Sequence, residues 1–257
     1  MKKTFETPRR SPAKQNLIYG IRPIIEAIHA GKEIDKLFIQ AGLKGELYKE
    51  LNELISKNRV PTQFVPIEKI NKLAPNNNQG VVGFLSSVSY QSLENVIMLA
   101  FEEGRAPLVL ILDRITDVRN FGAIVRTAEC AGIDAVIIPS KGAAQINEDA
   151  IKTSAGALHT MNICREENLK TTIHFLKASG LQVIAATEKA RIKYTDVDFT
   201  KPTAIIMGSE EDGVSNEYLK LCDQHLAIPL LGNIQSLNVS VACGVMLYEA
   251  VRQRTKN

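Results

Sequence analysis

The chain of 257 residues contains no tryptophan, and it has only four cysteines and four histidines. The cysteines lie far apart without a Cys-x-x-Cys pair, and no His-Glu-x-x-His occurs, which argues against a disulfide framework and against a metal site. No apolar run approaches the ~20 residues that a membrane-spanning helix needs. The first ten residues lack the apolar core of a signal peptide. We therefore expect a cytoplasmic protein with no membrane segment and no metal.

Two nucleotide-binding motifs are absent as well. A dinucleotide-binding protein needs Gly-x-Gly-x-x-Gly after its first strand, but the segment 113–122 contains one glycine. The segment Gly208-Ser-Glu-Glu-Asp-Gly213 has the glycine spacing of a P-loop, yet Val214 stands where the lysine belongs. Its three consecutive acidic residues would also repel phosphate groups. The sequence therefore excludes both nucleotide-binding classes.

The formal net charge of +3 comes from the N-terminal tail. Residues 1–15 hold five basic residues and one acidic residue, so the remainder of the chain carries a charge of −1. A polar tail of this kind cannot bury a core, and we expect it to be disordered. Basic tails favour phosphate contacts, although many solvated tails have the same composition.

The hydrophobic pattern divides the rest of the chain into two α/β domains. Residues 16–88 predict a small domain, residues 89–106 a linker that includes one helix, and residues 107–257 a larger domain. In the larger domain, nearly continuous apolar strands alternate with helices, which is typical of a parallel sheet covered on both faces. This pattern alone predicts an unknotted doubly wound sheet, because knots are nearly absent among proteins. The strands expected in it are 108–112, 135–138, 161–164, 182–185, 204–207 and 225–228.

Three of these strands end in glycine or polar residues before a helix begins. In open α/β sheets, ligands bind beyond the carboxyl ends of the strands, so one shared site is the simplest expectation. After the last strand, five polar side chains lie between Asn233 and Ser240 at the mouth of an apolar helix. A helix cap would explain one of them, but a buried polar group without a partner costs roughly 1–3 kcal/mol, which favours a ligand. The candidate site residues are Asn120, Arg126, Glu210, Ser236 and Asn238.

Arg126 has more than one interpretation. The sequence Ile124-Val-Arg-Thr-Ala128 places it within an apolar helix, where a charge needs a partner such as Glu210. An arginine on the helix surface and a solvated carboxylate in the loop would explain the same two residues. The sequence leaves these alternatives open.

These segments resemble the motifs of the SpoU (TrmH-type) RNA ribose 2′-O-methyltransferases, within the SPOUT superfamily. The similar stretches are Asn120-Phe-Gly-Ala-Ile-Val-Arg-Thr-Ala128, Met207-Gly-Ser-Glu-x-x-Gly213, and Ile228-Pro-x-x-Gly with Ser236-Leu-Asn-Val-Ser-Val-Ala242. In the first domain, Ile18-Tyr-Gly-Ile-Arg-Pro and Asn78-Gln-Gly-Val-Val-Gly83 look like the ends of the ribosomal-protein-L30e-like substrate-binding domain of RlmB-type 23S rRNA guanosine methyltransferases. One departure is Asn78, where such proteins usually carry histidine.

The resemblance implies transfer of a methyl group from S-adenosyl-L-methionine to a ribose 2′-hydroxyl in RNA, most specifically in a guanosine of 23S rRNA. A ribose of tRNA, or a non-catalytic RNA-binding role, is the alternative. For the fold, the resemblance implies a deep C-terminal trefoil knot. For the assembly, it implies a homodimer that uses the terminal helix.

The resemblance also assigns roles to residues. It makes Arg126 the group that activates the ribose hydroxyl, with Asn120 and Glu210 arranging the site. Glycine lets a backbone approach a ligand closely, so Gly208→Val is expected to abolish cofactor binding and to leave the thermal transition largely in place. The cofactor-binding residues that it implies are Thr187, Met207, Gly208, Ile228 and Leu237.

Overall fold

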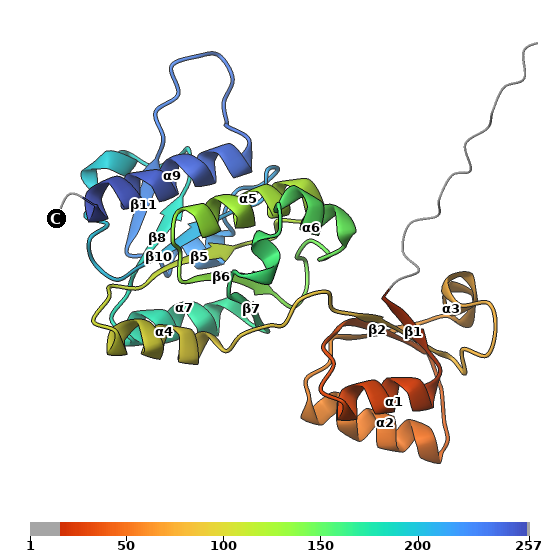
Figure 1. Ribbon diagram of the computed structural model, residues 1–257. Coiled ribbons are helices and arrows are strands. Elements are labelled where there is room, and N and C mark those ends of the chain that lie inside the picture. Colours follow the sequence, from red (N-terminus) through yellow and green to blue (C-terminus); the bar gives the residue numbers. More distant parts are fainter. Residues whose placement is uncertain (1–15, 256–257) are drawn as a thin grey trace, which may run out of the picture. The chain divides into compact units, whose positions relative to one another are not determined.

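The computed structural model describes residues 16–255, so the basic tail predicted at 1–15 lies outside the described residues. The chain divides into two compact units, Met1–Ser87 and Val88–Asn257, and each is described here by itself (Figure 1). Among residues 16–255, no helix is long and apolar enough to cross a membrane.

The first unit is a four-stranded sheet with helices on both faces. The strands are β1 (Leu17–Tyr19), β2 (Ile34–Gln40), β3 (Thr62–Val65) and β4 (Val81–Leu85), in the order β1-β4-β2-β3. Only β2 and β3 pair in parallel. Successive side chains of a strand point to opposite faces. Leu37 and Ile39 therefore pack under α1 (Ile21–His29) and α2 (Glu46–Lys57), whereas Phe38 packs under α3 (Ile67–Leu73).

The loop before β4 is held by side-chain amides. Asn78 is buried, and its Nδ2 donates to the carbonyl oxygen of Ala74 at 2.7 Å, while its Oδ1 accepts from the Gly80 backbone N–H at 2.8 Å. Gln79 Oε1 accepts from the Ile21 backbone N–H at 3.0 Å, which satisfies a donor at the start of α1. The two segments that resemble the ends of a substrate-binding domain therefore meet at one end of this sheet. At this position the asparagine has a structural role.

The second unit contains a seven-stranded sheet in which all pairs are parallel, in the order β7-β6-β5-β10-β8-β11-β9. The predicted α/β class and parallel sheet are thus confirmed. Side chains of β5 alternate between two cores, with Leu108, Leu110 and Leu112 in one and Val109 and Ile111 in the other. Burial of both faces explains why these strands are continuous apolar runs. The strands are β5 (Leu108–Leu112), β6 (Ala135–Pro139), β7 (Ile163–Glu166), β8 (Gln182–Ala186), β9 (Ile192–Lys193), β10 (Thr203–Met207) and β11 (Gln224–Ala227).

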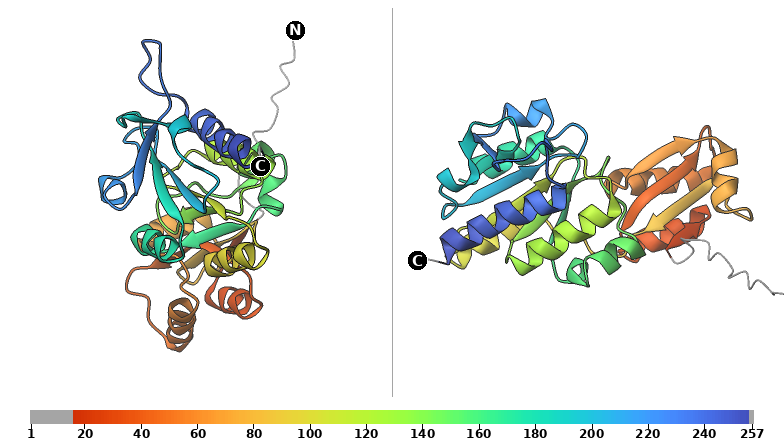
Figure 2. Two further views of the ribbon diagram at one scale, coloured as in Figure 1. Left: turned by 90° about the vertical axis from the view of Figure 1, so that its left-hand side faces the viewer. Right: turned by 90° about the horizontal axis from the view of Figure 1, so that it is seen from above.

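Helices cover the two faces of this sheet (Figures 1 and 2). On one face lie α4 (Leu93–Glu102), α7 (Leu169–Ala178) and the short α8 (Asn216–Leu219); on the other lie α5 (Val118–Cys130), α6 (Glu148–Thr153) and α9 (Val239–Arg254). Two 3-10 turns, Ala157–His159 and Tyr194–Asp196, complete the unit. Residues 89–106 are not the linker that the sequence predicted, because Leu93 and Ile97 of α4 are buried in the core of this unit.

The terminal helix α9 lies beside α5 and is anchored at its end. Cys243, Met246 and Leu247 are fully buried, whereas Val241 and Tyr248 are about half exposed. Arg254 in the last turn donates to three carbonyl oxygens, those of Ala106 at 2.6 Å, Phe199 at 2.8 Å and Lys201 at 2.9 Å, and to Pro107 at 3.4 Å. These carbonyls precede β5 and β10, so the last turn of the helix ties together the starts of two central strands.

Candidate active site

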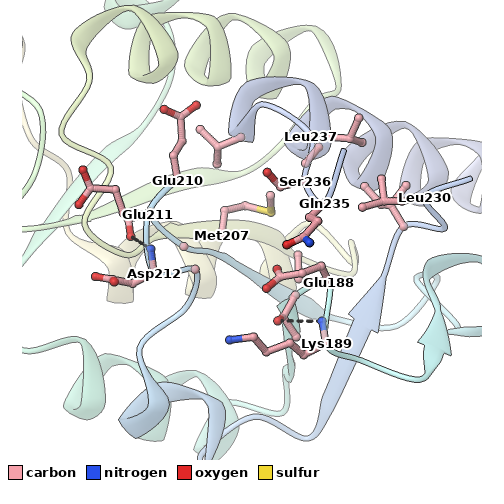
Figure 3. Close-up of a pocket in the computed structure, with 18 of the residues that line it drawn as sticks. Glu188, Lys189, Met207, Glu210, Glu211, Asp212, Leu230, Gln235, Ser236 and Leu237 are labelled. Atoms are coloured by element: carbon pink, nitrogen blue, oxygen red, sulfur yellow. Dashed lines mark hydrogen bonds between the residues drawn. The ribbon is translucent and has the colours of Figure 1, made fainter. Parts of the chain in front are cut away.

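A cavity lies beyond the carboxyl ends of β10, β8 and β11, which are neighbours in the sheet (Figure 3). Its volume is about 470 Å³, and its walls come from the segments that follow these strands and from the start of α9. Glu210 and Ser236 line it. The five residues assigned to the cofactor by resemblance also line it: Thr187, Met207, Gly208, Ile228 and Leu237.

Gly208 begins a loop that folds back onto itself. A Cβ placed on Gly208 would lie 2.0 Å from the carbonyl carbon of Gly213 and 2.1 Å from the backbone nitrogen of Val214. The turn is closed by the Gly213 N–H, which donates to the carbonyl oxygen of Ser209 at 3.0 Å. Any side chain at position 208 would strike this backbone. The expectation that Gly208→Val leaves the thermal transition in place is therefore wrong.

Three candidate residues from distant segments meet at the edge of the cavity. Glu210 Oε1 accepts from Nδ2 of Asn120 at 2.9 Å and from Nδ2 of Asn238 at 2.8 Å. The Asn238 amide also donates to Asn120 Oδ1 at 3.1 Å. We call Asn120, Glu210 and Asn238 the amide–carboxylate cluster. It places one carboxylate between two amides whose remaining donors and acceptors can orient a polar ligand.

Helix caps hold both amides of this cluster. Asp117 caps α5 by accepting from the backbone N–H of Asn120 at 2.7 Å. Asn238 is itself the N-cap of α9, because its Oδ1 accepts from the Ser240 backbone N–H at 3.0 Å. Asn238 is therefore both a helix cap and a member of the amide–carboxylate cluster. A residue fixed by its cap has little freedom to move, which pre-organises the cluster.

The burial argument made for the polar residues before α9 is only partly correct. Residues 231–238 are all exposed and form a loop that projects from this unit (Figure 1). Exposed polar groups carry no desolvation penalty, so Asn233 and Gln235 need no partner. Leu231 is 100% exposed and Ile234 is 79% exposed, which places apolar side chains at the tip of this loop.

Arg126 is not brought to the amide–carboxylate cluster within one chain. It lies six residues after Asn120 on α5, about 9 Å farther along the helix axis. Its side chain is exposed, does not line the cavity, and makes no hydrogen bond or ion pair within residues 16–255. The buried pair with Glu210 is therefore wrong, and the arginine lies on the helix surface.

The lining of the cavity contains acidic side chains from two segments and an apolar set of side chains. Glu188, Glu211 and Asp212 line it together with Glu210, against one cation, Lys189 (Figure 3). Met207, Ile228 and Leu237 supply the apolar wall. A ligand with a flat apolar body and a positively charged group would match both kinds of side chain. Among residues 16–255, no three histidine, cysteine or carboxylate side chains are arranged to hold a metal ion.

Two residues of the neighbouring β5 end were missed by the sequence reasoning. Asp113 is 1% exposed and accepts from both the backbone N–H and the hydroxyl of Ser215, at 2.7 and 2.6 Å. Arg114 follows it and reaches the loop after β10, where it pairs with Asp212 at 2.8 Å. An acidic residue directly after a buried apolar strand was the available signal, because such a carboxylate needs partners.

The cysteines do not take part in the site. Burial raises the pKa of Cys164, Cys222 and Cys243 to about 12, so all three stay protonated thiols near neutral pH. Cys130 is exposed on α5.

Comparisons with known proteins cover both units of the chain. The model of the SpoU rRNA Methylase family matches residues 107–248, and that of RNA 2′-O ribose methyltransferase substrate binding matches residues 17–91. A putative TrmH family tRNA/rRNA methyltransferase of Staphylococcus saprophyticus is 33% identical over 238 residues, which are 93% of this chain and 96% of that protein. A putative TrmH family tRNA/rRNA methyltransferase of Bacillus subtilis, YacO, is 30% identical over 94% of this chain and 97% of its own length.

Solved structures share the fold. The SpoU methyltransferase AviRb from Streptomyces viridochromogenes, in complex with AdoMet, is 27% identical with a TM-score of 0.60, over 94% of this chain and 91% of that chain. An AdoMet-bound rRNA methyltransferase from Sinorhizobium meliloti is 25% identical with a TM-score of 0.58, over 92% of this chain and 87% of that chain. The family model and the full-length relatives lead to one conclusion: this chain belongs to the SpoU rRNA methylase family of RNA methyltransferases.

Proposed function

We propose that this protein transfers a methyl group from S-adenosyl-L-methionine to a ribose 2′-hydroxyl in RNA. The observation that carries the proposal is the cavity at the carboxyl ends of β10, β8 and β11, bordered by the amide–carboxylate cluster. Two structural neighbours, AviRb and the Sinorhizobium meliloti enzyme, were solved with AdoMet. A binding protein without catalysis has no need for a carboxylate held between two amides beside such a cavity.

The residues of the cavity fit this cofactor. Met207, Ile228 and Leu237 offer an apolar wall for an adenine ring, and Gly208 lines the cavity without a side chain. The carboxylates in the same lining suit the positive charge of the sulfonium and the amino group. When bound, S-adenosylmethionine supplies an electrophilic methyl group.

The chain's own residues position the acceptor. Glu210 fixes the amides of Asn120 and Asn238, which we expect to orient the ribose, because methyl transfer requires oxygen, carbon and sulfur to lie in line. Ser236 lines the same cavity with its hydroxyl unpaired within residues 16–255. Arg126 is exposed and so available to a phosphate of the substrate. Its guanidinium stays protonated, so it does not act as a base. We assign to it the stabilisation of a developing 2′-alkoxide. This role requires the dimer proposed below, because Arg126 does not line the cavity of its own chain.

The substrate we propose is a guanosine of 23S rRNA. We assign RNA selection to the first unit, because the substrate-binding model matches residues 17–91. We propose that this unit is an L30e-like domain. Residues 107–257 hold sixteen basic and seventeen acidic residues and so lack bulk attraction for phosphate, whereas residues 1–15 are strongly basic. A tRNA ribose is the second candidate, because the TrmH/SpoU tRNA modifying enzyme of A. aeolicus is 33% identical over 64% of this chain.

We further propose that the protein is a homodimer through α9 and that its C-terminal segment forms a trefoil knot. Val241 and Tyr248 lie seven residues apart on α9 and are about half exposed, and Leu231 and Ile234 in the preceding loop are largely exposed. Apolar side chains gathered in this way favour a protein partner. A monomeric mass in analytical ultracentrifugation at micromolar concentration would contradict the dimer. A crystal structure in which the C-terminal segment does not pass through a loop of the preceding backbone would contradict the knot.

The activity is tested in two steps. Isothermal titration of the purified chain with S-adenosylmethionine is expected to show saturable binding, and no heat with or without RNA would favour the RNA-binding alternative. Methylated riboses are then mapped in rRNA and tRNA from a strain lacking this protein. Loss of one 2′-O-methylguanosine from 23S rRNA is the expected result, and a loss confined to tRNA would support the second candidate.

A further inference from the structure

The loop Ser209–Gly213, which forms the acidic wall of the cavity, carries three consecutive carboxylates, Glu210, Glu211 and Asp212. Like charges this close repel one another, so the loop needs partners to keep one conformation. Glu210 is held by the two amides of the cluster. Glu211 has no partner within residues 16–255. The partner of Asp212 comes from the end of β5.

That partner is Arg114, which makes contacts at several points of the loop. Its Nη1 pairs with Asp212 Oδ2 at 2.8 Å, and its Nη2 donates to the carbonyl oxygen of Gly213 at 3.0 Å. Its Nε donates to Asp113 Oδ1 at 3.2 Å. The planar guanidinium is the group whose donors can reach these three acceptors at once.

Asp113 makes the other half of the attachment. It is buried at the end of β5, and its Oδ2 holds the backbone N–H and hydroxyl of Ser215, just after the loop. Arg114 itself has φ of +58°, a left-handed conformation that side chains other than glycine rarely adopt and that costs free energy. The fold therefore keeps the Arg114 backbone in a strained conformation. From this conformation the side chain contacts Asp212 and Gly213 of the loop.

We propose that Arg114 is a positioning residue for S-adenosylmethionine, which acts by holding the loop Ser209–Gly213 in the conformation that forms the cavity wall. This inference rests on the proposed function. Arg114 does not line the cavity and touches no substrate, so its effect passes through Asp212 and Gly213, which do line it. It neutralises one of three carboxylates and fixes the backbone at Gly213, on which the close approach to Gly208 depends.

The test measures the dissociation constant of S-adenosylmethionine by isothermal titration, without RNA, so that the readout is independent of catalysis. Arg114→Gln keeps an unbranched polar side chain, although a shorter one, and removes the charge and the paired N–H donors of the guanidinium. It is expected to weaken binding about tenfold or more. Arg114→Lys retains the charge but cannot reach three acceptors, and should fall between Arg114→Gln and the wild type. Asp212→Asn removes the exposed ion pair together with one carboxylate of the cavity lining, leaves the bonds of Arg114 to Gly213 and Asp113 in place, and is expected to cost about two- to threefold.

The matched control is Arg119→Gln, five residues along the chain. Arg119 is exposed in the first turn of α5 and makes no hydrogen bond within residues 16–255, so binding should be unchanged. Hydrogen exchange at residues 208–215 should rise in Arg114→Gln, while exchange in β5 and β10 stays at the wild-type level. Wild-type affinity in Arg114→Gln would overturn the inference alone. A lower affinity accompanied by faster exchange throughout the unit would also overturn it, since the role would then be general stability. Absence of binding in the wild type would overturn the proposed function along with it.

Discussion

Replacing Arg254 by methionine should destabilise the second unit, although the change lies at the last turn of the chain. Methionine keeps an unbranched side chain and removes every donor. Arg254 makes three hydrogen bonds of 2.9 Å or less to carbonyl oxygens, and bonds to a charged group contribute roughly 1.5–3 kcal/mol each. Burial lowers the pKa of Arg254, which shows that desolvation of the guanidinium offsets part of this gain. We expect a net loss of about 2–4 kcal/mol, since water can replace some of the lost donors at a partly buried site.

The chain contains no tryptophan, so unfolding is followed by hydrogen exchange across a urea series, read on peptides of α9 and β10. The midpoint should fall while the slope of free energy against urea is unchanged, because the surface exposed on unfolding stays the same. Arg191→Met is the control, since Arg191 is exposed and makes no hydrogen bond within residues 16–255; its effect should stay within about 0.5 kcal/mol. A loss below about 0.5 kcal/mol for Arg254→Met would show that desolvation cancels the hydrogen bonds and that the anchor contributes nothing.

Four further outcomes are expected. Gly208→Ala should lower both cofactor affinity and the melting temperature, because its Cβ would strike the Gly213 backbone; an unchanged melting curve would contradict the observed close approach. Arg126→Lys should reduce turnover by at least ~10²-fold with cofactor affinity nearly unchanged, and wild-type turnover would remove Arg126 from the mechanism. Deletion of residues 1–87 should leave a folded dimer that binds cofactor but methylates RNA poorly; full activity would refute RNA selection by the first unit. Alkylation of the native protein near neutral pH should label Cys130 first, because it is exposed whereas Cys164 and Cys243 are buried and Cys222 is partly buried, and equal labelling of Cys243 would show that α9 opens readily.

Much of the larger sheet could be predicted from the sequence because its strands are buried on both faces. Leu108–Leu112 is an uninterrupted apolar run for this reason, and its predicted and observed bounds coincide. Strand β9 could not be predicted, since two exposed residues carry no periodicity. The predicted end of the first domain at residue 88 lies one residue from the end of the first unit at Ser87, but the pattern gave no sign that the helix after it packs into the second unit.

The candidate site was predictable to the extent that it depends on strand ends. Asn120 and Glu210 follow β5 and β10, which are paired, so their meeting follows from sheet order. The exposure of Arg126 depends on which side of α5 faces α9, and a local sequence pattern does not contain that information. The contact of Arg114 with Asp212 joins residues ninety-eight positions apart, and residue spacing along the chain does not predict such a contact.

The pairing of β5 with β10 has a consequence for synthesis of the chain on the ribosome. Leu108 pairs with Thr203, ninety-five positions later, while every strand pair of the first unit closes within residues 17–85. At roughly 5–20 residues per second, β5 waits on the order of 5–20 s for its central neighbour, with both of its faces apolar. The first unit can fold during that interval, whereas the second must shield an unfinished sheet. Overexpression should therefore yield more intact protein when chaperones that shield the unfinished sheet are supplied.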